Sequence, residues 1–122
     1  MAYDEFLGDR IRQIIESMHV DFFEKKMMGG LLFMVNDKMF CGIHFSKKRN
    51  TDLLMARIGA NATFLALDKV GCKPMDFTGR PMKGFVFVTP EGYDSDDDLE
   101  YWLQLCLDFN PEAKASKKKS NN

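Results

Sequence analysis

Few side chains in this sequence could carry out chemistry. The chain has two histidines and three cysteines, and Cys41 and His44 are the only cysteine and histidine close to each other in the sequence. They fall in a segment of alternating apolar residues that predicts a β-strand, where residues three apart point to opposite faces. A thiolate–imidazolium pair would form only if Gly42 introduced a bulge. We therefore interpret Cys41 as a buried core residue and expect no catalytic residue here.

The three cysteines also do not follow the spacing of a metal site. Cys41, Cys72 and Cys106 are separated by 31 and 34 residues, and the sequence contains no Cys-x-x-Cys motif. An odd number of widely spaced cysteines indicates neither a disulfide framework nor a zinc site. His-Glu-x-x-His and Gly-x-Ser-x-Gly motifs are absent as well. We expect free buried thiols, no metal, no cofactor and no enzymatic activity.

Two other segments resemble ligand sites only superficially. Asp94 and residues 96–98 form an acidic cluster, but they lack the spacing of a calcium loop, and acids in the first turn of a helix stabilise its N–H groups. Residues 79–84, Gly-Arg-Pro-Met-Lys-Gly, contain glycine and lysine as phosphate loops do. A Walker loop, however, needs Gly-Lys-Ser/Thr before a helix, whereas a strand is predicted after Gly84. We interpret both segments as structural.

The charge of the chain is divided between two unlike parts. Of 122 residues, 17 are basic and 18 acidic, for a net charge of −1. Residues 112–122 contain four lysines and one acid, which leaves 13 basic and 17 acidic residues, a net charge of −4, in residues 1–111. Bulk charge therefore does not indicate a nucleic-acid partner. Weak nucleic-acid binding through Lys47, Lys48, Arg49 and the lysine-rich tail remains an alternative.

Size and apolar content predict one folded domain. Apolar residues make up 45% of the chain, and a domain of this size buries enough surface to fold without disulfides or a metal. The longest apolar run is residues 31–35, and the amino terminus lacks the basic and apolar regions of a signal peptide. We expect a cytoplasmic protein with no membrane partner, a domain at residues 1–111, and a disordered tail at residues 112–122.

The hydrophobic pattern predicts the elements of this domain. Apolar residues at helical spacing indicate an amphipathic helix at residues 4–17. Four strand signals follow at residues 21–27, 31–35, 39–45 and 53–58, and their short connections predict an antiparallel meander. A short helix at residues 61–70, a strand at 85–88 and a helix between Ser95 and Pro111 complete the pattern. This order predicts an α+β domain in which helices cover an antiparallel sheet in two layers.

The turn-rich segment at residues 73–84 has two interpretations. It alternates apolar and charged residues, namely Met75, Phe77 and Met82 with Asp76, Arg80 and Lys83. In the first interpretation, the apolar residues hold a compact loop on the core while Asp76 pairs with Arg80 or Lys83. In the second, they form a surface that binds a partner, with Arg80 as the polar anchor.

Several motifs occur together in this sequence. They are Met-Ala-Tyr-Asp at residues 1–4, Glu-Lys-Lys-Met-Met-Gly-Gly at 24–30, Cys-Gly-Ile-His at 41–44, Leu-Met-Ala-Arg-Ile-Gly at 54–59, and Lys-Pro-Met-Asp-Phe-Thr-Gly-Arg-Pro-Met-Lys-Gly-Phe-Val-Phe-Val at 73–88. Together they resemble the TfoX/Sxy N-terminal domain family over about residues 1–110, and the last motif is highly specific. The family's usual Lys-x-Met-Phe-Gly-Gly motif has Met28 in place of phenylalanine, a substitution between similar apolar side chains.

The resemblance implies a fold related to the YjbR-like and secretion-chaperone-like domains. It also implies a bacterial, cytoplasmic context and a link to the regulation of competence genes for DNA uptake. The family's namesakes are positive regulators that act alongside a cyclic-AMP receptor protein and carry a second, C-terminal domain. At this length we expect a stand-alone N-terminal domain.

We therefore expect a non-enzymatic regulatory or protein-interaction module. Its expected partner is a protein of the transcription machinery or a cyclic-AMP receptor protein, and a homodimer and a small-ligand-binding domain remain open. The motifs that carry the resemblance lie in turns and an edge strand, so the expected partner-binding residues are Lys25, Lys26, Gly29, Gly30, Asp76, Arg80 and Lys83.

Overall fold

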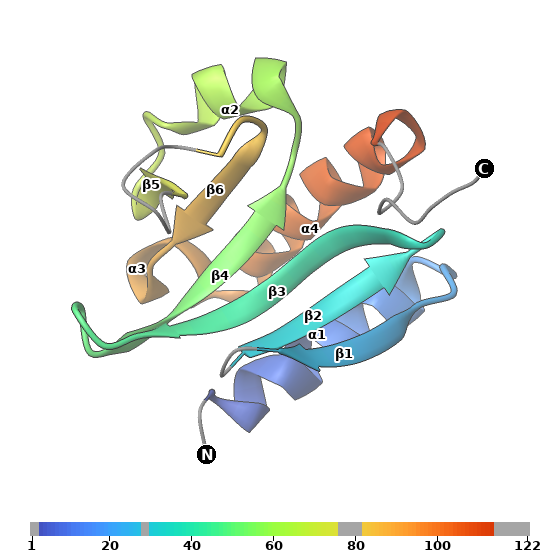
Figure 1. Ribbon diagram of the computed structural model, residues 1–122, viewed down its shortest axis with the longest axis horizontal. Helices are drawn as coiled ribbons and strands as arrows, with labels where there is room; N and C mark the ends of the chain where they lie inside the picture. The colour runs from blue at the N-terminus through green and yellow to red at the C-terminus, as the bar shows by residue number, and fades with distance from the viewer. Residues whose placement is uncertain (1–2, 28–29, 76–81, 114–122) are drawn as a thin grey trace.

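A six-stranded antiparallel sheet organises the domain (Figure 1). The computed structural model describes residues 3–27, 30–75 and 82–113. Its elements are α1 (Glu5–Ser17), β1 (Phe23–Met27), β2 (Gly30–Val35), β3 (Lys38–Ser46), β4 (Thr51–Arg57), α2 (Ala60–Ala66), β5 (Cys72–Pro74), β6 (Phe85–Val88), α3 (Pro90–Tyr93), α4 (Asp96–Phe109) and a 3-10 turn, η1 (Asn110–Glu112). The strand order is β1-β2-β3-β4-β6-β5, which confirms the predicted α+β class.

The two long helices, α1 and α4, cover one face of the sheet (Figure 1). Each helix buries one apolar stripe, which is what its hydrophobic periodicity predicts. The buried residues are Leu7, Ile11 and Ile15 of α1 and Leu99, Trp102, Leu103 and Cys106 of α4. They pack against side chains of β2, β3, β4 and β6 in one continuous core.

Both long helices begin with a side-chain cap, and that of α4 is the Ser95 from which the sequence predicts this helix to start. The Asp4 side chain accepts a hydrogen bond from the Phe6 N–H (2.9 Å), and the Ser95 hydroxyl accepts one from the Asp98 N–H (3.0 Å). Asp96 to Asp98 occupy the first turn of α4, where negative charge stabilises the helix end. The acidic cluster therefore has the structural role expected of it.

Strand β3 contains the one register shift between β2 and β3. Phe33 pairs with Cys41 while Met34 pairs with Met39, so Phe40 is an extra residue in β3. The bulge lies before Cys41 and not at Gly42. A Cβ at Gly42 would lie only 2.7 Å from the Leu31 carbonyl oxygen, so the glycine leaves room for this oxygen. Cys41 faces the helices, and His44 stacks on Phe87 on the opposite side of the sheet. The predicted separation of the two side chains is confirmed.

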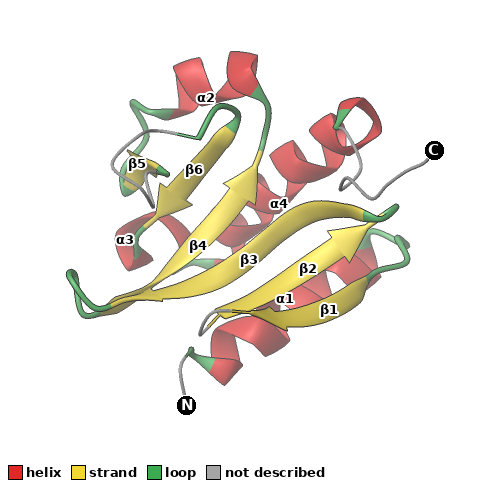
Figure 2. Cartoon of the chain, viewed as in Figure 1, coloured by secondary structure: helices red, strands yellow, loops and turns green. Residues whose placement is uncertain are grey.

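The second face of the sheet has its own apolar cluster. Leu53, Met55, Met75 and Phe87 are buried there, and Leu32, Met39 and Phe85 pack against them. This face is turned toward the viewer in Figure 2, and none of the described helices lies over it. No helix in the described part of the chain is long and apolar enough to cross a membrane.

The structure differs from the predicted elements mainly in three places. Strand β5 and helix α3 were not predicted, because elements of three and four residues are too short to show a hydrophobic period. Helix α2 ends at Ala66, four residues earlier than expected. Residues 110–112 form η1 and Ala113 is buried, and the predicted division of the chain at residue 111 stays a prediction. Residues 114–122, the expected tail, lie outside the described residues.

Helix α2 begins at a tight crossing of three chain segments. The N–H groups of Ile58 and Gly59 both donate to the Gly84 carbonyl, at 2.9 and 3.0 Å. Gly59 has φ 89° and ψ 157°, a conformation that essentially only glycine adopts. A Cβ at Gly59 would lie 2.6 Å from the Phe109 ring of α4. We call this contact of Gly59, Gly84 and Phe109 the α2 clamp, and it fixes where α2 starts.

Substituting the central glycine of the α2 clamp tests this role. Gly59→Ala should lower the free energy of unfolding by about 2–3 kcal/mol, because it adds backbone strain and a clash with Phe109. Gly8→Ala is the matched control: its Cβ would sit in α1 with no heavy atom closer than 3.6 Å, so it should raise stability by about 0.5–1 kcal/mol. Urea denaturation measures both, and equal effects of the two variants would contradict the clamp.

Candidate partner-binding site

Among the residues expected to bind a partner, those that the structure describes do not all lie together. Lys25 and Lys26 are on the edge strand β1, and Gly30 begins β2, where a Cβ would clash with the Ile43 carbonyl oxygen. Lys83 lies in the turn that leads into β6, and β2, β3 and β4 separate β6 from β1. Gly29, Asp76 and Arg80 lie outside the described residues. The described members of the expected site therefore belong to two distant parts of the sheet.

Even the two neighbouring lysines point to different sides. Lys25 pairs with Leu32, which packs on the second face, and Lys26 pairs with Leu31, which belongs to the core under the helices. Directly opposite residues in antiparallel strands share a face, so Lys25 and Lys26 are directed to opposite faces. They could not both contact one flat partner surface.

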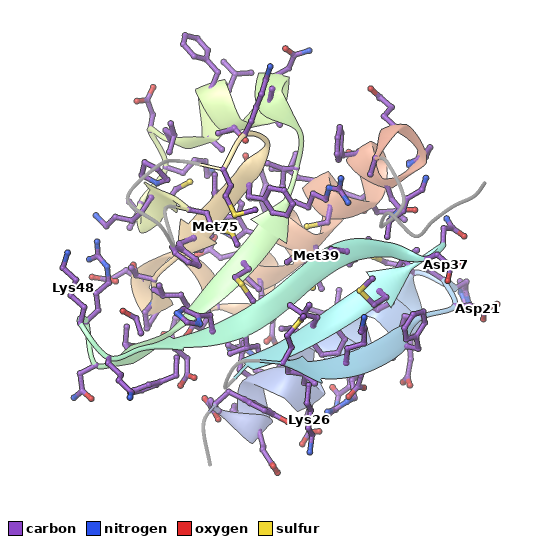
Figure 3. The ribbon with its side chains drawn as sticks, in the orientation of Figure 1. Asp21, Lys26, Asp37, Met39, Lys48 and Met75 are labelled. Carbon is purple, nitrogen blue, oxygen red and sulfur yellow. The ribbon has the colours of Figure 1, made fainter. Side chains whose placement is uncertain are left out.

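The alternative nucleic-acid residues occupy a single exposed turn. Lys47, Lys48 and Arg49 form the tip of the β3–β4 hairpin, where the Arg49 N–H donates to the Ser46 hydroxyl at 3.2 Å. Figure 3 shows Lys48 at one extremity of the molecule, well away from Lys26. All three residues are exposed there, and whether they bind nucleic acid stays a prediction.

The turn-rich segment 73–84 is partly packed. Met75 is 2% exposed and lies in the cluster on the second face (Figure 3), which agrees with a loop held on the core. The Met82 N–H donates to the Met75 carbonyl at 2.7 Å, while the Met82 side chain is 40% exposed. The predicted pairing of Asp76 with Arg80 or Lys83, and the role of Phe77, lie outside the described residues.

Several exposed apolar side chains lie on α2 and on the segments next to it. We call this group the α2 patch, and its members are Phe64, Leu65, Leu67, Val70 and, from α4, Tyr101. Phe64 and Leu65 are 80% and 73% exposed, and Val70 is 71% exposed. Single exposed apolar residues are normal on a protein surface, but several together mark interaction sites. We predicted this helix from the sequence without inferring which of its sides would face solvent.

The orientation of α2 explains why these residues are exposed. Figure 1 shows α2 beyond the ends of β4 and β6, where it covers neither face of the sheet. Ala66 is the buried residue of the helix, and Ala62 is partly buried against the core. Thr63 is held by its hydroxyl, which donates to the Gly59 carbonyl at 2.8 Å. The inner side of α2 is thus built from small residues, and its large residues point outward.

A groove of about 490 Å³ lies beside the α2 patch. Leu65 and Val70 form one wall, and the start of α4 forms the other. Its charged lining residues are Asp68, Glu91, Asp98 and Lys69. Trp102 is 1% exposed at the bottom, and its indole N–H donates to the Gly92 carbonyl at 2.9 Å. We call this feature the α2–α4 groove.

The groove has an acidic character with one internal cation. The Glu91 carboxylate accepts a hydrogen bond from the Thr89 hydroxyl (2.6 Å), which lowers the pKa of Glu91. The Lys69 ammonium lies 4.3 Å from the centre of the Tyr101 ring, a cation–π arrangement. Lys73 on β5 is near enough to Glu91 to lower its pKa as well.

The thiols and the histidine on the sheet are not arranged for catalysis. Burial raises the pKa of Cys72 to about 11 and that of Cys106 to about 12, and it raises the pKa of Cys41 well above its ordinary value. These thiols are therefore protonated near neutral pH and are poor nucleophiles. Burial also lowers the pKa of His44. Among the described residues, no three His, Cys, Asp or Glu side chains are grouped so that they could hold a metal.

Comparison with known proteins identifies a family for this chain. Residues 19–110 match the TfoX N-terminal domain family. The comparisons with curated proteins and with solved structures found no match. The matched range extends from the end of α1 to the end of α4, and it includes α2 and both walls of the α2–α4 groove.

The buried thiols predict a fall in stability at alkaline pH. An unfolded thiol titrates near pH 9, whereas Cys72 and Cys106 keep their protons until about pH 11 and 12. Between pH 9 and about 11 the unfolded chain releases protons that the folded chain retains, so the free energy of unfolding falls as the pH rises. From pH 8 to about 10.5 we expect a loss of at least about 2 kcal/mol.

Urea denaturation under reducing conditions measures this loss. Cys72→Ala should reduce the fall by about 1–2 kcal/mol, because one buried thiol no longer contributes. A stability that stays constant from pH 8 to about 10.5, or a fall that is the same in the variant, would contradict the protonated, buried state of Cys72.

Proposed function

The chain belongs to the TfoX N-terminal domain family, and we propose that it is a non-enzymatic regulatory module that acts by binding a protein partner through the α2 patch. The family makes it a competence-regulator-like domain. In keeping with that role, the proposed partner is a protein of the transcription machinery, such as a cyclic-AMP receptor protein, and the proposed process is the regulation of DNA uptake in the cytoplasm of a bacterium.

The exposure of Phe64 and Leu65 is the observation that carries this proposal. Fully burying a large apolar side chain contributes roughly 1.5–3 kcal/mol, yet these two adjacent side chains remain 80% and 73% exposed. The fold does not use them for its own stability, because Ala66 makes the buried contact of α2. A partner that covers them would gain this apolar area without any rearrangement of the domain.

The absence of enzymatic activity is proposed on chemical grounds. Catalysis by a protein side chain usually needs a nucleophile or base with a suitably shifted pKa in an accessible pocket. Here the pKa shifts of Cys41, Cys72 and Cys106 are caused mainly by burial in the core, and they disfavour the thiolate. The described charged residues of the α2–α4 groove are carboxylates and one lysine.

The variant Phe64→Ser with Leu65→Ser tests the proposed function. In the source bacterium, it should fail to restore transcript levels of DNA-uptake genes after deletion of the native gene. Phe6→Ser is the matched control, since Phe6 is 70% exposed on α1 and lies outside the α2 patch. Both variants remove exposed apolar area, so neither should lose more than about 0.5 kcal/mol of stability.

Quantitative RT-PCR measures the transcript levels, and thermal unfolding measures the stability of each variant. Full activity of the Phe64→Ser, Leu65→Ser variant would contradict the proposal, and so would an equal loss of activity in Phe6→Ser. Lys25→Ala with Lys26→Ala, and Arg80→Ala with Lys83→Ala, belong in the same experiment, because they remove the residues that the sequence motifs indicated. A loss restricted to these pairs would place the partner site on the motifs and away from α2.

A further inference from the structure

We propose that the α2 patch and the α2–α4 groove together bind an amphipathic segment of the partner, which covers the patch with apolar side chains and places an arginine or lysine in the groove. This inference rests on the proposed function, namely that the domain binds a protein, and it adds the chemistry of the segment that is bound. The occupant is a protein segment that is both apolar and basic.

The apolar half of this surface continues into the groove. Leu65 and Val70 belong to the α2 patch and also line the groove, as does Tyr101 on the α4 side. A segment that lies across α2 would therefore meet apolar side chains first and the groove next. This is the arrangement in which one face of an amphipathic helix supplies apolar anchors and its flank supplies charges.

The charges that line the α2–α4 groove favour a bound segment whose flank is basic. Three carboxylates, those of Asp68, Glu91 and Asp98, line it together with the Lys69 ammonium, and Lys73 lies close enough to Glu91 to act on its charge. Among the described residues, acids therefore outnumber bases by three to two. Complementary charge at an interface steers the correct partner and penalises partners with like charge. The same carboxylates repel phosphate groups, so this surface is unsuited to nucleic acid. The cations of the β3–β4 hairpin tip, where the alternative nucleic-acid residues lie, are a separate feature.

The aromatic side of the groove already holds a cation from this chain. The Lys69 ammonium lies 4.3 Å from the centre of the Tyr101 ring. Lys69 follows α2 in an exposed turn and has a flexible side chain. An incoming guanidinium can take the same position, since arginine stacks on aromatic rings and pairs with carboxylates through several N–H groups. Lys69 would then move aside into solvent.

Trp102 makes the proposal measurable. It is the only tryptophan of the chain, and it lies at the bottom of the α2–α4 groove with its indole N–H bonded to Gly92. A ligand in the groove changes the polarity around this ring. Binding can therefore be followed by the intrinsic fluorescence of the whole chain, without a label.

The probe is a synthetic amphipathic helical peptide of about 18 residues with leucines on one face and arginines on the other. The same peptide with glutamates in place of arginines is its control. At about 150 mM salt, where long-range attraction is largely screened, the arginine peptide should change Trp102 fluorescence and bind about tenfold more tightly than the glutamate peptide.

A pair of charge variants locates the binding. Asp68→Asn with Asp98→Asn should weaken the arginine peptide about fivefold or more, because both carboxylates line the groove. Glu16→Gln with Asp21→Asn is the matched control: it removes the same charge next to His19, away from α2, and should change affinity by less than about twofold.

Leu65→Ser should weaken binding without moving Trp102. Equal weakening by the two charge pairs would overturn the proposal, because it would indicate attraction to net charge alone.

Sedimentation equilibrium of the chain alone tests the other occupant, a second copy. A monomer supports the proposal, whereas a dimer that Leu65→Ser dissociates would overturn it in favour of self-association.

The peptide result and the gene-expression result are separable. If the arginine peptide binds the groove but the Phe64→Ser, Leu65→Ser variant still regulates DNA-uptake genes, the proposed function fails while the groove chemistry stands. If that variant loses regulation and the glutamate peptide binds equally well, the groove chemistry fails alone.

Discussion

The α2 clamp is the constraint on which the surface of this domain depends. The Gly84 carbonyl accepts hydrogen bonds from two consecutive N–H groups, those of Ile58 and Gly59, while the Phe109 ring packs where a Gly59 side chain would be. These contacts join the end of β4, the start of β6 and the end of α4 at one point. Helix α2 must leave from this point, so it extends past the sheet and does not lie on it. Its large side chains therefore face solvent, and its small ones face the domain.

Most of the fold could be predicted from the sequence because local and long-range signals agree. Helices α1 and α4 have long apolar stripes and side-chain caps at Asp4 and Ser95, and the β2–β3 hairpin has Asn36 and Asp37 at positive φ, 56° and 63°, as a tight hairpin turn requires. The position of β6 could not be predicted in this way. It pairs with β4 on one side and β5 on the other, and such non-sequential pairing is set by packing and leaves no local pattern.

The candidate site could be predicted less well, for a physical reason. The sequence motifs indicated charged residues such as Lys25 and Lys83. The distance between these two residues is set by the strand order, which places three strands between β1 and β6. The apolar residues of the α2 helix were visible as a helical signal. Ala62 and Ala66, four residues apart, were the available sign of its inner side, since residues at this spacing share one face of a helix. With the alanines turned inward, Phe64 must point away from the domain, and Leu65 lies on the flank of the helix, where it lines the α2–α4 groove.

The central claim is that the α2 patch is the surface through which this TfoX-type domain meets its partner. Site-specific photo-crosslinking in cells of the source organism tests it most directly, with a benzophenone amino acid placed at Phe64 in one strain and at Phe6 in another. Both positions are strongly exposed, at 80% and 70%, so both are accessible to other proteins in the cell. The account predicts one discrete protein crosslink from position 64 and none from position 6. No crosslink at position 64, or the same product from both positions, would contradict it.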